Sequence, residues 1–425
     1  MVDSRIVLRG LPLVALGLLA IAIPSAHAEE RLSSAEFRAR IQGTLPELES
    51  FAADVLSAKA KVADAQTRPA VSLSYEREEV FTGNDGVALK NAVALGWSLD
   101  ISGRRGRHIK SAKLGVDAAK QTSELSKTFV TIRAMEVYYL AAQARLKAES
   151  LTATRIPLAT LVDSLRNRVN EGDASGYDLA RFELELAEHD DALAAATTER
   201  VVAEAELAAL LGASDSRVVA ASELPLPSLS EGSENLAGSV HRGDVLAAQH
   251  EERGGELLKK AASRWWVPVL DLSIGYLNTD FGPGGGPGAN FAHGYTGMIS
   301  ASIPVFSKGE ADRKRGEAQV RRAKAKRKIL ERRIGSEIGS ARTRLAARVQ
   351  QTLQFQERQL VRAADLAVKT KAAYQGGEAS ALELRDAYNK ASSAQLRFID
   401  LRYQCQLAEL ALWKATGTLG AGVNQ

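Results

Sequence analysis

The chain has 425 residues, a formal net charge of +4 and a single cysteine, Cys405. This nearly balanced charge lacks the strongly basic character of nucleic-acid-binding domains, so we expect no nucleic-acid partner. The lone cysteine excludes an intrachain disulfide, and its leucine and alanine neighbours favour the role of a small buried hydrophobe. None of the six histidines is paired at helical spacing, so the sequence predicts no metal site and no cofactor.

The first 28 residues have the pattern of a secretory signal peptide. Arg5 and Arg9 precede an apolar run from Leu11 to Ile23, and the small residues Ala26 and Ala28 mark a cleavage site. The run is shorter than the about 20 residues that a membrane-spanning helix needs, which favours a cleaved signal over an anchor. We therefore expect an exported protein.

An amphipathic strand pair is predicted in each half of the chain. The first pair covers 70–76 and 93–101, and the second covers 269–277 and 296–306, with loops between the paired strands. In the strand from 93 to 101, apolar residues alternate with small or polar ones, the period-two pattern of a strand with one apolar face. Four strands are fewer than the about eight of the smallest membrane barrels, so closure into a barrel needs several copies of the chain.

Aromatic residues fall at the ends of the predicted strands. Such positions suit the belt of aromatic side chains at a membrane interface, although the edge of an ordinary soluble sheet would also accept them. The candidates for membrane-interface aromatics are Tyr75, Trp97, Trp265, Trp266, Tyr276, Tyr295 and Phe306.

A very long helix is predicted from about Gly106 to Val169. At 1.5 Å per residue it is a rod of roughly 90 Å. Two heptad seams follow it, one through Val116 and Ser123 and the other through Leu125 and Ile132, roughly 160° apart around the axis. A helix with seams on opposite sides needs a neighbour on each side, as in a wall that can close into a tube.

The chain contains an internal duplication. The segment 168–175 reappears as 373–380, an offset of 205 residues, and 98–101 matches 302–305 at an offset of 204. Each copy has the order helix, strand, strand, very long helix, Gly-containing turn, helix. The predicted domains are a signal peptide at 1–28, a first repeat at 29–212, a linker at 213–238 and a second repeat at 239–425.

The duplicated unit and its turn pattern, Gly-x-x-Ser-x-x-Asp/Glu-Leu, resemble the TolC-like outer membrane factor family over the whole mature chain. The pattern begins with Gly172 and Ser175 in the first copy and with Gly377 and Ser380 in the second. The resemblance implies a mixed α and β membrane protein. Its four strands per protomer would complete a transmembrane β-barrel by trimerisation, and its long helices would pack like coiled coils into a periplasmic α-barrel.

The resemblance also implies a function. A homotrimer in the cell outer membrane, in contact with outer membrane lipid, would be the channel of a tripartite efflux system. Its partners would be a periplasmic adaptor (membrane fusion) protein and an inner membrane pump of the resistance-nodulation-division type. The segment 102–107 resembles the cation-efflux branch that serves cobalt-zinc-cadmium exporters, which implies heavy-metal cations as cargo and a role in metal resistance.

Other functions stay open at this point. Drugs or secreted polypeptides are alternative cargoes, and a periplasmic coiled-coil adaptor or scaffold is an alternative role. The chain has no nucleophile elbow, no metal-spaced histidine pair and no phosphate-binding loop motif, so the sequence predicts that it is not an enzyme.

The resemblance further implies a gate of carboxylates just after the two Gly-Ser turns, at the periplasmic tip. Three copies of each acid near one axis would attract cations, and neighbouring arginines would latch the ring. The family's usual basic latch position is occupied here by Ala379, and acids stabilised by a helix dipole are the alternative interpretation. The candidate gate residues are Asp178, Arg181, Glu383, Arg385 and Asp386.

Overall fold

The computed structural model describes residues 30–82, 86–212, 218–221, 223–227, 242–280, 291–303 and 309–419. The expected signal peptide, residues 1–28, and the aromatic candidate Phe306 lie outside these residues. The elements, in chain order, are β1 (Glu30–Leu32), α1 (Ser34–Thr44), α2 (Pro46–Gln66), β2 (Ser72–Thr82), β3 (Gly86–Asp100), α3 (Arg104–Asn170), α4 (Gly176–Leu210), β4 (Val218–Ala220), α5 (Gly243–Ala262), β5 (Val269–Asp280), β6 (Phe291–Ser302), α6 (Glu310–Phe355), a π-helical turn (Gln356–Leu360), α7 (Val361–Gln375) and α8 (Ala381–Thr416).

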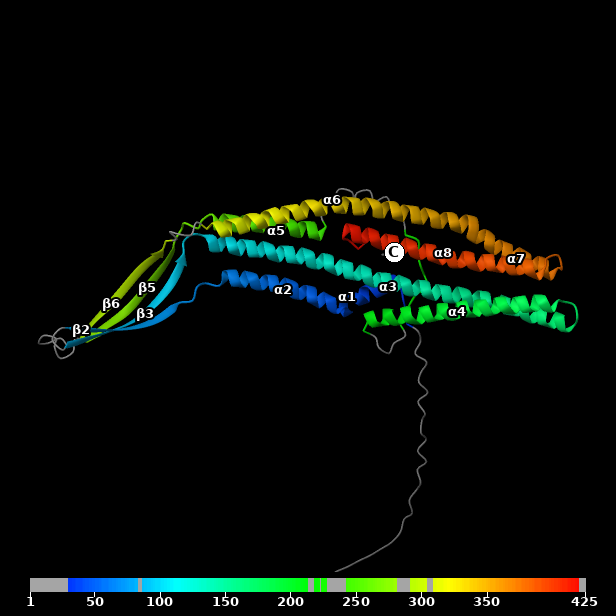
Figure 1. The fold of residues 1–425 in the computed structure, drawn as a ribbon, viewed down its shortest axis with the longest axis horizontal. Helices are drawn as coiled ribbons and strands as arrows, with labels where there is room; N and C mark the ends of the chain where they lie inside the picture. The colour runs from blue at the N-terminus through cyan, green and yellow to red at the C-terminus, as the bar shows by residue number, and fades with distance from the viewer. Residues whose placement is uncertain are drawn as a thin grey trace, which may run out of the picture.

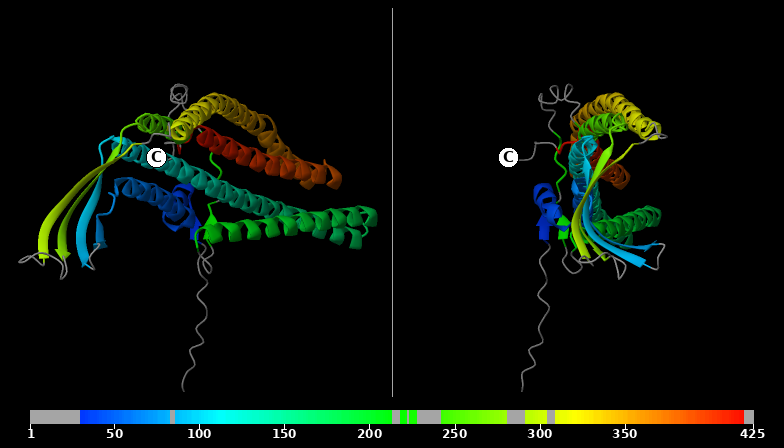
Figure 2. Two further views of the ribbon diagram at one scale, coloured as in Figure 1. Left: turned by 60° about the vertical axis from the view of Figure 1, so that its left-hand side comes forward. Right: turned by 90° about the vertical axis from the view of Figure 1, so that its left-hand side faces the viewer.

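The molecule is a long rod with a four-stranded sheet at one end and two helical hairpins at the other (Figure 1). Near the sheet, the helices pack in the order α2, α3, α5, α6. Nearer the hairpin tips, α4 packs beside α3 in the place of α2. There α8 replaces α5: it packs against α3 on one side and against α6 and α7 on the other. Figure 2 shows that the sheet is curved and bends away from the line of the helices.

Helix α3 is buried on two opposite sides, as its two heptad seams predicted. On one side the Ser123 hydroxyl donates a hydrogen bond to the Phe51 carbonyl of α2 over 3.4 Å. On the other side Gly243 of α5 lies so close that a Cβ there would be 2.5 Å from the Gln121 carbonyl oxygen. The helix runs for 67 residues without a break, although Pro157 lies inside it. The predicted wall helix is therefore confirmed, two residues longer at its start.

The second long helix has nearly the same length as the first and begins in the same way, but it is interrupted. Both begin directly after a glycine in the left-handed region, Gly103 with φ of 66° and Gly309 with φ of 59°. The second runs from Glu310 to Gln375 and contains the π-helical turn Gln356–Leu360. A π-helical turn inserts an extra residue into the helical register, so it divides this rod into α6 and α7.

The largest hydrophobic core lies midway along the rod, where α1, α3, α4 and α8 meet. Phe37 stacks on Tyr138 with ring centroids 5.1 Å apart, and Leu410 of α8 is 1% exposed beside them. The buried Tyr138 hydroxyl donates to the Leu32 carbonyl over 2.8 Å. This bond ties α3 to β1, which pairs in parallel with β4.

The four-stranded sheet is antiparallel, with the order β2-β3-β5-β6. The first hairpin was predicted with a loop over 77–92, and this is wrong, because pairing continues from Arg77 with Asn91 to Thr82 with Gly86. The ladder needs only backbone groups, so it continues where the apolar alternation stops, and cross-strand charges such as Lys90 and Glu78, 3.2 Å apart, accompany it.

The sheet has one apolar and one polar face. Residues that are paired across antiparallel strands share a face, so Tyr75, Val93, Tyr276 and Tyr295 form one row across all four strands. On the helix side of this row the same face continues through leucine and isoleucine residues and Trp97. The opposite face carries mainly serine, threonine, alanine and glycine.

The sequence predicted that the aromatic candidates lie at strand ends, and for several of them this is wrong. Tyr75, Tyr276 and Tyr295 lie inside strands, because the strands extend past them into a polar stretch. Trp265 and Trp266 lie in the turn between α5 and β5, at the junction of helices and sheet. The apolar face is therefore bordered by the tyrosine row on one side and by this junction on the other.

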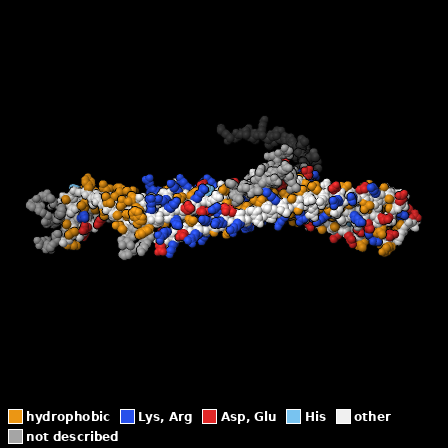
Figure 3. Space-filling view, turned by 90° about the horizontal axis from the view of Figure 1, so that it is seen from above, with side chains coloured by type: hydrophobic (Ala, Val, Ile, Leu, Met, Phe, Trp, Pro, Cys, Tyr) orange, Lys and Arg blue, Asp and Glu red, His pale blue; other side chains and the backbone are white. Residues whose placement is uncertain are grey.

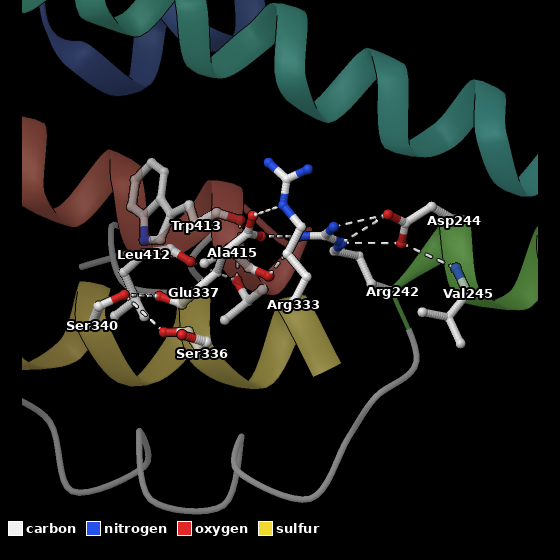
Figure 4. A network of polar contacts seen from close by, with 11 residues as sticks. Arg242, Asp244, Val245, Arg333, Ser336, Glu337, Ser340, Leu412, Trp413 and Ala415 are labelled. Atoms are coloured by element: carbon white, nitrogen blue, oxygen red, sulfur yellow. Dashed lines mark hydrogen bonds and ion pairs between the residues drawn. The ribbon is translucent and has the colours of Figure 1, made fainter. Parts of the chain in front are cut away.

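A buried arginine holds the joint where α8 ends and α5 begins (Figure 4). The Arg242 guanidinium donates to Asp244, to Glu337 of α6 over 3.0 Å, and to the Ala415 carbonyl over 3.2 Å. Its side chain is only 8% exposed. One guanidinium thus satisfies a carbonyl at the α8 C-terminus and holds α6 beside the joint.

We expect Arg242→Ala to lower the free energy of unfolding by about 2–4 kcal/mol, since two carboxylates lose a shielded partner. Arg333→Gln is the matched control. Arg333 donates to the same Glu337 over 2.6 Å, but it is 70% exposed, so its loss is expected to cost less than about 1 kcal/mol. Chemical denaturation of both variants gives the comparison, and equal losses would contradict the role assigned to Arg242.

Candidate functional site

The two Gly-Ser turns lie together at the end of the rod that is far from the sheet (Figure 1). Their backbones are alike: the N–H of Asp173 donates to the Arg168 carbonyl, and the N–H of Glu378 donates to the Ala373 carbonyl, each over 2.8 Å. Gly172 and Gly377, which directly precede Asp173 and Glu378, have φ of 86° and 78°. The duplication seen in the sequence therefore reproduces the same turn geometry twice.

The two serines of the turn motif are the N-caps of the helices that follow. The Ser175 hydroxyl accepts a bond from the Tyr177 N–H of α4. Ser380 forms a capping box with Glu383: its hydroxyl accepts from the Glu383 N–H, and its own N–H donates to the carboxylate over 2.7 Å. Hydrogen bonds from the backbone and hydroxyl of Ser380 lower the pKa of Glu383. This candidate gate acid thus also holds the start of α8.

Arg385 connects the two hairpins. Its guanidinium donates to Asp386 over 2.6 Å and lies 3.8 Å from the Glu185 carboxylate of α4. Asn389 donates to the same Glu185 over 2.5 Å. Arg385 is 14% exposed, whereas Asp386 is 54% exposed. We call Glu185, Arg385, Asp386 and Asn389 the tip cluster.

The electrostatics of the tip cluster keep Asp386 charged. The hydrogen bond from Arg385 lowers the pKa of Asp386, and the positive charges of Arg385, Lys390 and Arg181 lower it further. Arg181 is exposed on α4, and Asp178 is exposed in the first turn of that helix. The structure thus brings Arg385 and Asp386 into one cluster with Arg181 nearby, and it gives Asp178 no described polar partner in the cluster.

Sequence reasoning missed Glu185 and Asn389. Both lie further along their helices than the turn motif, on faces that meet only when the hairpins are packed together. The offset between them is 204 residues, one less than the offset of 205 that relates the two turns. Their bond therefore joins nearly equivalent positions of the two repeats.

Helix α4 is held firmly to α3. Arg155 binds both carboxylate oxygens of Asp190, over 2.5 and 3.2 Å, and Arg166 binds Glu183 over 2.8 Å. Below them, Phe182 and Leu165 are buried with Leu384 of α8 in a small apolar cluster. The first hairpin thus has two ion pairs of its own. The tip cluster links it to the second hairpin near the tips, and further along the rod Gln143 and Lys147 of α3 both contact Asp400 of α8.

A metal site and a membrane-spanning helix each have requirements that the described residues do not meet. No three His, Cys, Asp or Glu side chains in the described part of the chain are grouped so that they could hold a metal ion. Of the helices that the structure describes, none combines the length and apolarity that a bilayer crossing requires.

Comparison with known proteins gives a family match over part of the chain and a shared fold over most of it. Residues 239–418 match the family model described as "Outer membrane efflux protein". No curated protein sequence matches the chain significantly. The matched family is one of efflux proteins, which supports the prediction of a transport protein and not of an enzyme.

Several solved structures share the fold over nearly the whole chain. The outer membrane protein VceC of Vibrio cholerae has a TM-score of 0.70 at 18% identity, covering 91% of this chain and 96% of its own. The open state of the MtrE outer membrane channel of Neisseria gonorrhoeae has 0.72 at 16%, covering 91% and 89%. CusC has 0.70 at 17%, covering 92% and 93%. The predicted fold class, long helices with a β-sheet as in TolC-like outer membrane channels, is confirmed.

The left-handed turn glycines give a test of the tip geometry. We expect Gly377→Ala to lower the free energy of unfolding by about 1 kcal/mol, because an L-residue is strained at positive φ. No atom lies within 4 Å of the added Cβ, so the loss reports the backbone alone. The neighbouring Gly376, with φ of −81°, is the control, and Gly376→Ala should cost clearly less. Thermal denaturation followed by circular dichroism distinguishes the two variants.

Proposed function

We propose that this chain is the channel subunit of a tripartite efflux system. Its residues 239–418 match the outer membrane efflux protein family, and its fold is that of TolC-like outer membrane channels. Three copies would form one channel in the outer membrane with a helical tunnel in the periplasm. A periplasmic adaptor and an inner membrane pump of the resistance-nodulation-division type would complete the system.

The exposed apolar face of the sheet is the observation that carries this proposal. Leu73 is 72% exposed, Ile299 is 75% exposed and Tyr295 is 87% exposed, all on that one face. Large apolar side chains gathered on one face are costly in water and mark a surface that contacts lipid or another protein. The polar opposite face would then line a water-filled passage.

The edges of the described sheet and helix layer support the assembly. In the four-stranded sheet, β2 and β6 each pair with one neighbour only, so each leaves an edge that a further copy could pair with. Helix α2, at one side of the helix layer, has no buried residue, and its Leu56 is 66% exposed. Three copies joined at these edges would give twelve strands and a closed tunnel wall.

The tip cluster is the proposed gate. Arg385 neutralises Asp386 and Glu185 while the hairpins are together, and moving α7 and α8 outward would break its contact with Glu185. Three copies of Asp386, each with its pKa lowered, would then present negative charge to the passage. Such a ring favours cations, in agreement with heavy-metal cations as the proposed cargo.

We assign selection of the cargo to the pump and not to this channel. Cation passage through the channel would rest on the charge of its acids, because no metal-holding group of side chains occurs among the described residues. The resemblance of residues 102–107 to the cation-efflux branch supports metal ions over drugs or secreted polypeptides. Export of each class from a deletion strain would decide among them.

Planar-bilayer conductance of the purified protein tests the gate. We expect low conductance for the wild type and several-fold higher conductance for Arg385→Gln and Glu185→Gln, since each removes the link between α4 and α8. Asp386→Ala should in addition reduce the preference for cations over anions.

Glu188→Gln is the matched control, because Glu188 is an exposed carboxylate on the same helix, outside the tip cluster. Its conductance should stay at the wild-type level. Unchanged conductance in both Arg385→Gln and Glu185→Gln would refute the gate, and a protein that forms no channel in any bilayer would refute the proposed function.

A further inference from the structure

The two ends of the rod differ strongly in charge. Residues 104–116, at the start of α3, contain five Lys or Arg and no acid, and residues 310–324, at the start of α6, contain six Lys or Arg and three acids. At the opposite end, residues 171–191 contain eight acids and one arginine. Positive charge is therefore concentrated where the helices meet the sheet.

The basic side chains of α6 form a surface that we call the cationic collar. Figure 3 shows that Lys and Arg side chains gather on the helices directly beside the hydrophobic side chains of the sheet, on the same face of the molecule. The collar consists of Arg313, Lys314, Arg315, Arg321, Arg322 and Lys324.

The acids of α6 do not cancel the cationic collar. Lys314, Arg315 and Arg321 each pair with an acid three or four residues away, but these arginine and lysine side chains remain 73–80% exposed. Exposed pairs of this kind bind weakly and leave the cations available to a stronger anionic partner. Basic side chains that serve only to keep a helix face in water could be scattered along the rod. That role gives no reason for their concentration beside an apolar surface.

A cavity of about 540 Å³ lies at the base of the collar, between α3, α5 and α6. Its lining includes Arg104, His108, Trp265, Arg315 and Arg322. The one acid in the lining, Asp312, pairs with Arg315 over 2.9 Å and is outnumbered by three arginines. Cavities of a few hundred cubic ångströms are the size that binds a small molecule or a headgroup.

One wall of the cavity is rigid. The Arg104 guanidinium donates to the carbonyls of Arg264, Trp265 and Val267, over 3.0, 2.7 and 3.0 Å. These bonds fix the turn that carries Trp265 immediately before β5, whose apolar face begins with Leu270. Aromatic and basic side chains at the border of an apolar surface are the residues that contact lipid headgroups.

We propose that the cationic collar and its cavity bind anionic phospholipid headgroups of the periplasmic leaflet. The phosphodiester would lie against Arg315 and Arg322, and the acyl chains would cover the apolar face of the sheet. This inference rests on the proposed function, since it requires the apolar face to lie in the membrane. A free phosphate would use the arginines but would have no reason to lie beside the apolar face, so the lipid is the occupant to which the geometry points.

Binding of phosphatidylglycerol to the purified, detergent-solubilised full-length protein tests the proposal, with phosphatidylcholine as the neutral comparison. We expect tighter binding of phosphatidylglycerol, and a preference that falls as salt is raised. Arg315→Gln/Arg322→Gln should weaken phosphatidylglycerol binding by about twenty-five-fold, from about fivefold for each cation removed. Binding of phosphatidylcholine should stay unchanged.

Two control variants make the test specific. Arg358→Gln/Arg362→Gln removes two exposed cations of the same rod far from the sheet and should leave lipid binding unchanged. Arg315→Lys/Arg322→Lys keeps the charge and should retain most of the preference. A folding defect would weaken both lipids alike, which separates it from a lost headgroup site.

Three outcomes would overturn the proposal. Equal binding of the two lipids by the wild type would remove the headgroup site. Full competition by inorganic phosphate would show a soluble anion in place of a lipid, and salt-sensitive binding of polyglutamate without any lipid preference would indicate an acidic protein partner. Bilayer conductance is read separately: conducting channels without a lipid preference would refute this inference alone, whereas the absence of channels in every lipid would refute the proposed function.

Discussion

The burial of α3 on two opposite sides is the constraint on which the rest of the molecule depends. A helix of 67 residues cannot fold into a globule, and it is stabilised here by α2 and α4 along one side and α5 and α8 along the other. Because isolated helices gain little stability from propensity alone, each of these neighbours is needed along its own part of the rod. The result is a layer that is one helix thick, which leaves free faces on both sides.

Two arginines fix the relative positions of helices that apolar packing alone would leave undetermined. Arg242 fixes the point at which α8 ends and α5 begins, and Arg385 links α8 to α4 at the tips. The two differ in the closeness of their contacts: the Arg242 guanidinium donates to Glu337 over 3.0 Å, whereas the Arg385 guanidinium lies 3.8 Å from Glu185. A close hydrogen bond suits a permanent connection, and a longer contact suits a connection that opens and closes.

The sheet end combines two surfaces that would be unfavourable in a protein surrounded only by water. The apolar face leaves large side chains such as Tyr295 exposed, and the cationic collar beside it concentrates like charges. Both become favourable next to a lipid bilayer with anionic headgroups, where apolar side chains leave water and the cations gain partners. The tip of the first hairpin carries the opposite charge, with eight acids and one arginine in residues 171–191, so the two ends of the rod differ in chemistry.

The sequence by itself determined the repeating plan of this protein. Helix length, the two heptad seams, the period-two alternation from Val93 to Ile101 and the turn glycines are local patterns, and each depends on residues close together in the chain. The resemblance carried by the Gly-Ser turns predicted the fold class, and the comparisons with solved structures confirmed it.

Only the tertiary structure decided the features that join distant segments. The strands run beyond their apolar stretches because backbone pairing depends on a partner strand, which alternation along one strand does not reveal. Asp386 and Arg385 were visible near the turn, but Glu185 and Asn389 join them only after two helices from different repeats pack together. The sequence therefore fixes the elements and their periodicity, while contacts between residues about 200 positions apart are set by the packing of the folded chain.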